Sequence, residues 1–213
     1  MISFSNLSLI LLAYLLGSIP SAVWVGKMLY GVDVRDYGSG NAGATNTFRV
    51  LGKKAGLPVL LMDILKGFLA VKLVYLTGKY LPETQQFINL ELSLGVASLL
   101  GHIFPIFAGF RGGKGVATLT GILCAVHIGA ALICIAAFVL TLFLTQYVSL
   151  SSMMAAITFP ISIMFIYHET VPGLNIFAMF VCVLVFITHQ KNIERLLRGE
   201  ESKVGFGARR KLS

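Results

Sequence analysis

A glycine-rich run around residue 40 has the composition of an anion-binding loop. Its glycines allow the backbone to turn tightly, so that successive N–H groups point towards one place. Hydroxyl and amide side chains add neutral donors, and Arg49 adds a forked guanidinium that suits phosphate oxygens. The candidate phosphate-binding residues of this run are Gly38, Ser39, Gly40, Asn41, Gly43, Thr45, Asn46 and Arg49. The alternative is a tight turn in which Ser and Asn only cap the next helix.

A second glycine-rich run surrounds Lys114. Its Gly-Gly-Lys-Gly sequence leads into an apolar helix, which places free N–H groups and the positive helix end beside a mobile ammonium. The candidate phosphate-binding residues here are Arg111, Gly112, Gly113, Lys114 and Gly115. In the alternative interpretation the two cations only anchor a helix end to lipid headgroups, which does not require the glycines.

A third polar segment follows the last apolar run and places His189 and Asn192 three residues apart, on one face of a helix. His189 titrates near neutrality and would move a proton or donate to a phosphate. An ordinary amphipathic surface helix is the alternative for this segment. Ser149, Ser151 and Ser152 fall in a turn before another apolar run and would add hydroxyl donors.

Two further polar features are interpreted as structural. Asp63 and Lys66 lie three residues apart inside an apolar run, where a mutually neutralising pair that orients the helix is favoured over catalysis. His102 lies on an otherwise apolar helix and is interpreted as a packing residue rather than as a base.

The composition places all these segments in a membrane protein. Of 213 residues, 56% are hydrophobic and 12% are charged, and the mean hydropathy is +0.85. Soluble domains carry about 25% charged residues, because water must meet a polar surface. The apolar stretches are Leu7–Tyr30, Leu57–Thr77, Leu90–Phe110, Val116–Tyr147, Ser149–Tyr167 and Leu174–Thr188. The basic residues lie between these stretches rather than in a stripe on a soluble face, which argues against a nucleic-acid partner.

The basic residues also set the topology. Most of the 17 Lys and Arg residues lie in the gaps at 27–54 and 111–114 and in the tail after 190, which the positive-inside rule assigns to the cytoplasm. Single passes through all the apolar stretches would leave the basic tail outside. The stretch Val116–Tyr147 is too long for one span, and a turn at residues 127–129 would divide it into two spans of about 14 residues, each roughly 21 Å long.

The sequence therefore predicts an all-α integral membrane fold of about seven transmembrane helices, some of them short, with the N-terminus outside and the C-terminus in the cytoplasm. We expect one polytopic membrane domain over residues 1–213, with cytoplasmic motif segments at 37–54, 110–118 and 188–201. Because all three segments fall on the cytoplasmic face, they predict a phosphate-handling active site there.

With these segments in this order, the sequence resembles the bacterial acyl-phosphate:glycerol-3-phosphate acyltransferase family. The matching residues are GSGNAGATN at 38–46 with Arg49, HIFPIFAGFRGGKGVAT at 102–118 and THQKNIERLLRGEE at 188–201. Any one of these motifs is weak, whereas three in order over essentially the whole chain are specific. The resemblance implies a seven-helix fold whose site faces the cytoplasm from the bacterial inner membrane.

The resemblance also implies a reaction. A fatty acyl group would pass from acyl phosphate to the 1-hydroxyl of sn-glycerol 3-phosphate, giving lysophosphatidic acid and inorganic phosphate in the first acylation of phospholipid synthesis. The resemblance implies no metal or other cofactor. It does imply a functional link to an enzyme that makes acyl phosphate. Glycerol phosphate would lie near Arg49, Lys114 and the glycine turn, and acyl phosphate near Ser39. The implied catalytic residues are Ser39, Arg49, Lys114, His189 and Asn192.

Some alternatives remain open at the level of the sequence. The base that deprotonates the glycerol hydroxyl is either His189 or a phosphate oxygen of the substrate. Direct transfer is favoured over a covalent intermediate on Ser39, because no base beside Ser39 is visible. The main rival function is an organic-phosphate transporter, whose site would lie near the membrane midplane. A scaffold that binds anionic lipid is the second rival and leaves the glycine spacing unexplained.

Overall fold

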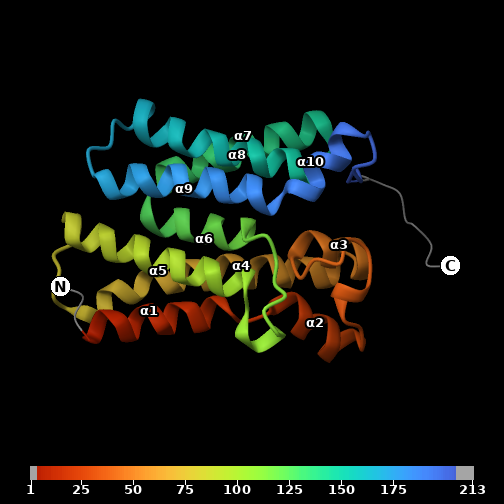
Figure 1. The fold of residues 1–213 in the computed structure, drawn as a ribbon, viewed down its shortest axis with the longest axis horizontal. Helices are drawn as coiled ribbons and strands as arrows, with labels where there is room; N and C mark the ends of the chain where they lie inside the picture. Colours follow the sequence, from red (N-terminus) through yellow and green to blue (C-terminus); the bar gives the residue numbers. More distant parts are fainter. Residues whose placement is uncertain (1–3, 205–213) are drawn as a thin grey trace.

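The computed structural model describes residues 4–204, and within this range the chain forms helices and loops without a β-strand. The long helices lie lengthwise along the longest axis of the molecule (Figure 1). The α-helices are α1 (Phe4–Gly17), α2 (Ser21–Tyr30), α3 (Ala44–Leu51), α4 (Lys53–Lys72), α5 (Gln85–Ile103), α6 (Val116–Val126), α7 (Ile128–Thr145), α8 (Val148–Ile161), α9 (Pro172–Thr188) and α10 (Gln190–Leu197). Shorter helical turns are η1 (Val34–Asp36), η2 (Leu73–Thr77), η3 (Ile106–Ala108) and η4 (Ser162–Ile166). The predicted all-α class is confirmed.

Several helices are long and apolar enough to cross a membrane. Within residues 4–204 these are the segments Gln85–Ala108, Ile128–Thr145 and Val148–Ile166. Two bent pairs add a crossing each if each pair counts as one span, namely α1 with α2, bent by 41°, and α9 with α10, bent by 60°. Large apolar side chains on these helices are exposed, as is usual where lipid replaces water as the solvent. The chain is therefore a multi-pass membrane protein.

The longest apolar stretch is broken at His127, as its length predicted. α6 ends at Val126 and α7 begins at Ile128. The Nδ1 atom of His127 accepts a hydrogen bond from the backbone N–H of Ala130 at 3.1 Å and so caps α7. The two helices have 11 and 18 residues rather than equal lengths, because this cap starts α7 at the beginning of the predicted turn.

Glycines bring two pairs of helices into close contact. A Cβ atom on Gly121 of α6 would lie 1.9 Å from the carbonyl oxygen of Ile64 in α4. A Cβ atom on Gly17 of α1 would lie 2.0 Å from the carbonyl oxygen of Ser98 in α5. Only glycine fits at these contacts, and small residues serve the same purpose in other membrane helix pairs. α6, which packs against α4, begins at Val116, two residues after Lys114.

The three polar segments meet towards one end of the molecule. α2, α3 and α10 lie at this end, towards which the loop between α5 and α6 also runs, whereas α1 begins at the opposite end (Figure 1). Segments that are far apart in the sequence therefore share one surface, which we call the polar end.

Candidate active site

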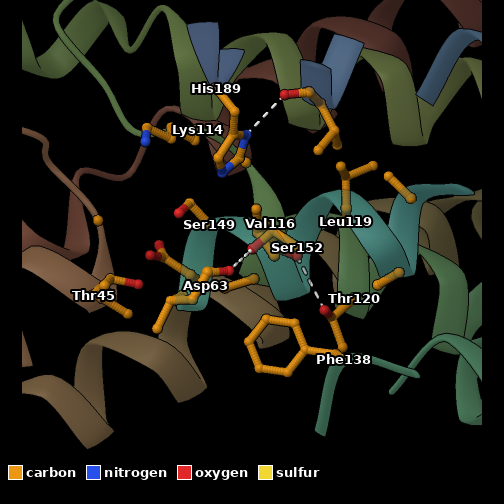
Figure 2. A pocket seen from close by; sticks show the side chains of 18 of the residues that line it. Thr45, Asp63, Lys114, Val116, Leu119, Thr120, Phe138, Ser149, Ser152 and His189 are labelled. Carbon is orange, nitrogen blue, oxygen red and sulfur yellow. Dashed lines mark hydrogen bonds between the residues drawn. The ribbon is translucent and has the colours of Figure 1, made fainter. Parts of the chain in front are cut away.

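A cavity of about 420 Å³ lies among the three polar segments. A smaller cavity of about 310 Å³ shares part of its lining, including Ser39, Lys114 and Asn192. Figure 2 shows the side chains of Lys114 and His189 among those that line the main cavity. The predicted residues that line the main cavity are Ser39, Asn41, Gly43, Thr45, Asn46, Arg49, Lys114, Gly115, Ser152, His189 and Asn192. Gly40 lines the smaller cavity.

The first glycine-rich run is shaped by Asn46, whose side chain is buried. The Asn46 amide donates to the carbonyl oxygens of Val34 at 2.7 Å and Tyr37 at 3.1 Å, and its Oδ1 accepts from the Ser39 N–H at 2.8 Å. These bonds hold the loop over the start of α3. Gly38 has a left-handed φ of +62°, and a Cβ there would lie 2.4 Å from Asn46 Oδ1. Gly38 therefore shapes the loop without lining either cavity, and the Asn46 amide is occupied by backbone partners.

Two helix N-termini converge on the main cavity. Gly43 is the N-cap of α3, and Gly115 is the N-cap of α6. Each of these glycines lines the cavity together with the two residues that follow it. The first N–H groups of a helix have no partner within the helix, and the helix dipole makes this end positive. Arg49 of α3 and Lys114, directly before Gly115, add two cations to the same space. This arrangement binds anions such as phosphate.

The glycines at 112 and 113, predicted to bind phosphate, pack against the end of α5 in the structure. A Cβ on Gly112 would lie 2.0 Å from the carbonyl oxygen of His102, and a Cβ on Gly113 would lie 2.2 Å from His102 Nε2. The N–H of Gly113 donates to that same carbonyl at 3.1 Å. These two glycines do not line either cavity; they allow the loop to pack against the end of α5, which places Lys114.

Ser151 and Ser152, predicted together, separate in the structure. Both are buried, and each hydroxyl donates to the backbone carbonyl four residues earlier in the chain, at 2.8 and 2.9 Å. Ser152 lines the main cavity, whereas Ser151 lines neither cavity because it lies on another face of α8. Ser149, on the cavity side, donates to Glu201 Oε1 at 2.7 Å.

Arg111, a predicted phosphate ligand, is exposed and lines neither cavity. We expect Arg111→Ala to keep kcat/KM for the phosphate substrate within about threefold of wild type, as is usual for a surface charge. Steady-state kinetics of the purified variant in lipid vesicles would measure this. A loss of 100-fold or more would return Arg111 to the site and imply that the loop rearranges around substrate.

A hydrogen-bonded chain connects the second and third polar segments. Lys114 Nζ donates to Asn192 Oδ1, and Asn192 Nδ2 donates to Glu201 Oε1 at 2.6 Å. Arg195 Nε donates to Glu201 Oε2 at 2.8 Å. Glu201 thus holds an amide, a guanidinium and the Ser149 hydroxyl in fixed positions. Although burial raises the pKa of Glu201, hydrogen bonds from Arg195, Ser149 and Asn192 lower it on balance, so the carboxylate stays ionised.

His189 is neutral near pH 7. Its ring Nδ1 lies 2.7 Å from the carbonyl oxygen of Val185, which can only accept, so Nδ1 carries the proton. Nε2 is then left as an acceptor. Burial and the nearby Lys114 ammonium lower the pKa of His189 to about 4. Burial also lowers the pKa of Lys114, to about 8, so this cation is close to its titration range.

The residues that line the main cavity but were not predicted as site residues include Asp63, His102, Arg195 and Glu201. The predicted ion pair between Asp63 and Lys66 is confirmed, with 2.9 Å between Oδ1 and Nζ. The pair alone gave no sign that Asp63 also faces the cavity. For Glu201, the available signal was an acidic residue in a mostly basic tail, close to a helix that carries two candidate ligands.

The part of the cavity beyond these polar groups is apolar. It runs between α6, α7, α8 and α9, and Phe159 in its lining is fully buried. Thr120 and Phe138 also border it (Figure 2). Its lining residues include Leu123, Ala131, Cys134, Ile135, Phe138, Ala156, Phe159 and Val181. A space with a cationic entrance and an apolar interior suits an amphiphile with a phosphate head and a hydrocarbon chain.

Comparisons with known proteins match this arrangement. The sequence profile of a family described as "Glycerol-3-phosphate acyltransferase" matches residues 7–199. The chain is 49% identical over 215 residues to a glycerol-3-phosphate acyltransferase of Enterococcus faecalis, a match that covers 95% of this chain and 94% of that protein. It is 39% identical over 229 residues to a glycerol-3-phosphate acyltransferase of Chlorobium phaeobacteroides, with 94% and 97% covered.

Two crystal structures of PlsY (YgiH), described as an integral membrane glycerol 3-phosphate acyltransferase, have the same fold. The TM-scores are 0.83 for the glycerol 3-phosphate form and 0.81 for the lysophosphatidic acid form. The sequence identities are 39% and 38%, and each match covers 94% of this chain and 96% of that chain.

Proposed function

This chain belongs to the glycerol-3-phosphate acyltransferase family and is an integral membrane acyltransferase. We propose the acyl donor, the acceptor hydroxyl and the products of its reaction. A fatty acyl group passes from acyl phosphate to the 1-hydroxyl of sn-glycerol 3-phosphate, which gives lysophosphatidic acid and inorganic phosphate. The acyl phosphate comes from a separate enzyme that acts earlier in phospholipid synthesis. The observation that carries this proposal is the main cavity, in which two helix N-termini and the cations Arg49 and Lys114 adjoin an apolar space.

The two phosphates bind at the polar end of the cavity. Arg49, Lys114 and the first turn of α6 hold glycerol 3-phosphate, because they combine forked and mobile cations with free N–H groups. The acyl phosphate head lies near Ser39, at the junction of the two cavities, and its hydrocarbon chain enters the apolar space. Asn192 and His189 complete the donors and acceptors around the reacting groups.

Acyl transfer is direct in this proposal. The glycerol oxygen attacks the acyl carbonyl carbon, the bond from that carbon to the phosphate oxygen breaks, and the developing charge is stabilised by the cations and N–H groups. A histidine with a pKa of about 4 is a poor match for a hydroxyl proton at neutral pH. The hydroxyl proton therefore passes to a phosphate oxygen of the substrate, whose second pKa is near 6. His189 Nε2 accepts a hydrogen bond and orients the substrate.

The membrane arrangement follows from charge and helix length. We propose seven crossings of the bacterial inner membrane, in which α4 and the short α6 are added to the spans that length and hydropathy identify, so that α1 with α2 forms one bent span followed by α4, α5, α6, α7, α8 and α9. α6 is short, and its buried Leu119 and Ile122 pack against neighbouring helices rather than lipid. The basic residues at the polar end support a cytoplasmic position for the active site and the C-terminus, as the positive-inside rule predicts.

The activity is expected to have a bell-shaped dependence on pH. His189 must be neutral to accept a hydrogen bond and the substrate phosphate must be ionised to accept the proton, so kcat/KM rises as the pH passes from about 4 to about 6. Lys114 must be protonated to hold a phosphate, so kcat/KM falls as the pH passes about 8. A pH profile of kcat/KM for glycerol 3-phosphate would measure both limbs, after subtraction of acyl phosphate hydrolysis in empty vesicles.

Lys114→Arg separates the alkaline limb from other titrations. Arginine stays charged at any pH that the assay reaches, so the alkaline fall of the residual activity should move to higher pH. Ionisation of the substrate phosphates is the same for both proteins and cancels in the comparison. An alkaline limb at the same pH in both proteins would assign it to a group other than Lys114.

The test of the proposed function is phosphate release by the purified protein in phospholipid vesicles. We expect acyl phosphate to release inorganic phosphate only when glycerol 3-phosphate is present, with lysophosphatidic acid formed in equal amount. Release without the acceptor would indicate a hydrolase. Saturable uptake of glycerol 3-phosphate into sealed vesicles, without phosphate release, would indicate a transporter instead.

A further inference from the structure

A buried charged cluster borders the polar part of the cavity, and the acyl transfer described above does not use it. Asp63 is 1% exposed, and its Oδ1 lies 2.9 Å from Lys66 Nζ and accepts a hydrogen bond from Ser21 Oγ at 2.9 Å. His102 Nδ1 lies 3.7 Å from the same oxygen. Charged side chains at this depth in a membrane protein are costly and usually border a functional site or path.

The members of this cluster differ in what they face. Asp63 and His102 line the main cavity, whereas Lys66 and Ser21 do not. Figure 2 shows Asp63 and Thr45 among the side chains that border the cavity. The contacts that Asp63 makes with Lys66, Ser21 and His102 all use Oδ1. An ion pair that only orients α4 does not require its carboxylate to line the cavity. A structural role in the ion pair therefore explains the position of Lys66 but not that of Asp63.

The cluster is coupled to the loop that carries Lys114. The His102 carbonyl accepts a hydrogen bond from the N–H of Gly113 at 3.1 Å, and Gly113 directly precedes Lys114. A glycerol 3-phosphate whose phosphate is held by Lys114 and the start of α6 extends its carbon chain into the cavity that Asp63 lines. We propose that Asp63 Oδ2 accepts a hydrogen bond from the 2-hydroxyl of glycerol 3-phosphate and so selects acceptors that carry this hydroxyl. This inference rests on the proposed function.

The chemistry of the carboxylate fits this assignment. An ionised carboxylate only accepts hydrogen bonds, so a hydroxyl is a suitable partner. Without that partner a cavity-facing oxygen is left unpaired in a dry site, and such sites reject analogues that lack the hydroxyl. The bond to the 2-hydroxyl also orients the adjacent 1-hydroxyl towards the acyl carbonyl. Loss of the bond should therefore lower kcat as well as raise KM.

The test compares two acceptors in the vesicle assay with acyl phosphate as the donor. The first is glycerol 3-phosphate, and the second is 3-hydroxypropyl phosphate, which keeps the phosphate and the primary hydroxyl but lacks the 2-hydroxyl. Wild type should prefer glycerol 3-phosphate by about 10- to 100-fold in kcat/KM. Asp63→Asn should lower kcat/KM for glycerol 3-phosphate by a similar factor and leave that for the analogue within about threefold. The preference is then lost.

Ser21→Ala is the matched control, because it removes a donor to the same carboxylate without lining the cavity. It should keep the preference for glycerol 3-phosphate. If Asp63→Asn does not fold, the double variant Asp63→Asn/Lys66→Met removes both charges together and is compared in the same way. Equal use of both acceptors by wild type, or an unchanged preference in a folded Asp63 variant, overturns the inference. A wild-type protein that releases no phosphate with either acceptor contradicts the proposed function instead.

Discussion

Replacement of Lys114 by alanine is expected to lower kcat/KM for glycerol 3-phosphate by about 10²- to 10³-fold, the usual cost of removing one stabilising donor from a preorganised site. Lys114 lines both cavities and donates to Asn192 Oδ1. The substitution therefore removes a cation from the phosphate and leaves the Asn192 oxygen without its donor. KM should rise because Lys114 holds the phosphate in the ground state, and kcat should also fall because the same cation stabilises the charge that develops in the transition state. Phosphate release in vesicles, titrated with glycerol 3-phosphate, would measure both constants.

Lys53→Ala is the matched control for this prediction. Lys53 is the first residue of α4, is exposed and lines neither cavity, so its loss changes the net charge by the same amount without changing the site. Its kcat/KM should stay within about threefold of wild type. If Lys114→Ala retains a wild-type KM and more than a tenth of the activity, then Lys114 does not bind the phosphate and the assignment of the two substrates must be reversed.

The helical architecture could be predicted because hydrophobic length and charge are local properties of the sequence. The break at His127 is the clearest case: the apolar run was too long for one span, and the positive-inside rule required another crossing. The unequal lengths of α6 and α7 could not be predicted, since they depend on which side chain caps α7. That cap is made by His127 itself, three residues before its partner Ala130.

The candidate site was predicted where glycines mark the start of a helix, and less well elsewhere. Gly43 and Gly115 cap helices that point into the cavity, as anion binding requires. Gly112 and Gly113 belong to the same kind of glycine-rich run, yet in the structure they allow the loop to lie close to His102. Spacing along the chain does not distinguish a glycine that faces a ligand from one that packs against a helix, because the difference lies in a tertiary contact.

Residues that act through contacts between distant segments were not predictable. Arg111 and Lys114 lie three residues apart in the same loop, but only Lys114 reaches the cavity. Glu201 contacts Ser149, which is 52 residues earlier in the chain, and no pattern in the sequence indicates this pair. Asp63 was predicted to pair with Lys66. The ion pair already explained a charge in an apolar helix, so there was no reason to expect the Asp63 carboxylate at the cavity.

Replacement of Glu201 by glutamine is expected to lower kcat/KM by about 10²-fold and to lower the thermal unfolding temperature. The Glu201 side chain is 6% exposed, and its two oxygens accept hydrogen bonds from Ser149, Asn192 and Arg195. Glutamine has nearly the same shape, but one oxygen becomes an NH₂ group, which donates where these partners also donate. At least one of them must move or lose its bond. Asn192 then no longer holds Lys114 in place, so activity falls although no group that touches substrate has been replaced.

Glu200→Gln provides a matched control for the loss of one negative charge. Glu200 is the exposed neighbour of Glu201 and lines neither cavity, so its variant should keep wild-type kinetics and stability. The alkaline limb of the pH profile gives a further readout, because the negative charge of Glu201 raises the pKa of Lys114 against the effect of burial. Neutral glutamine should therefore move this limb to lower pH, while Glu200→Gln leaves it in place. If Glu201→Gln unfolds at the wild-type temperature and keeps the wild-type alkaline limb, Glu201 is not electrostatically coupled to Lys114, and the chain from Lys114 through Asn192 to Glu201 does not organise the site.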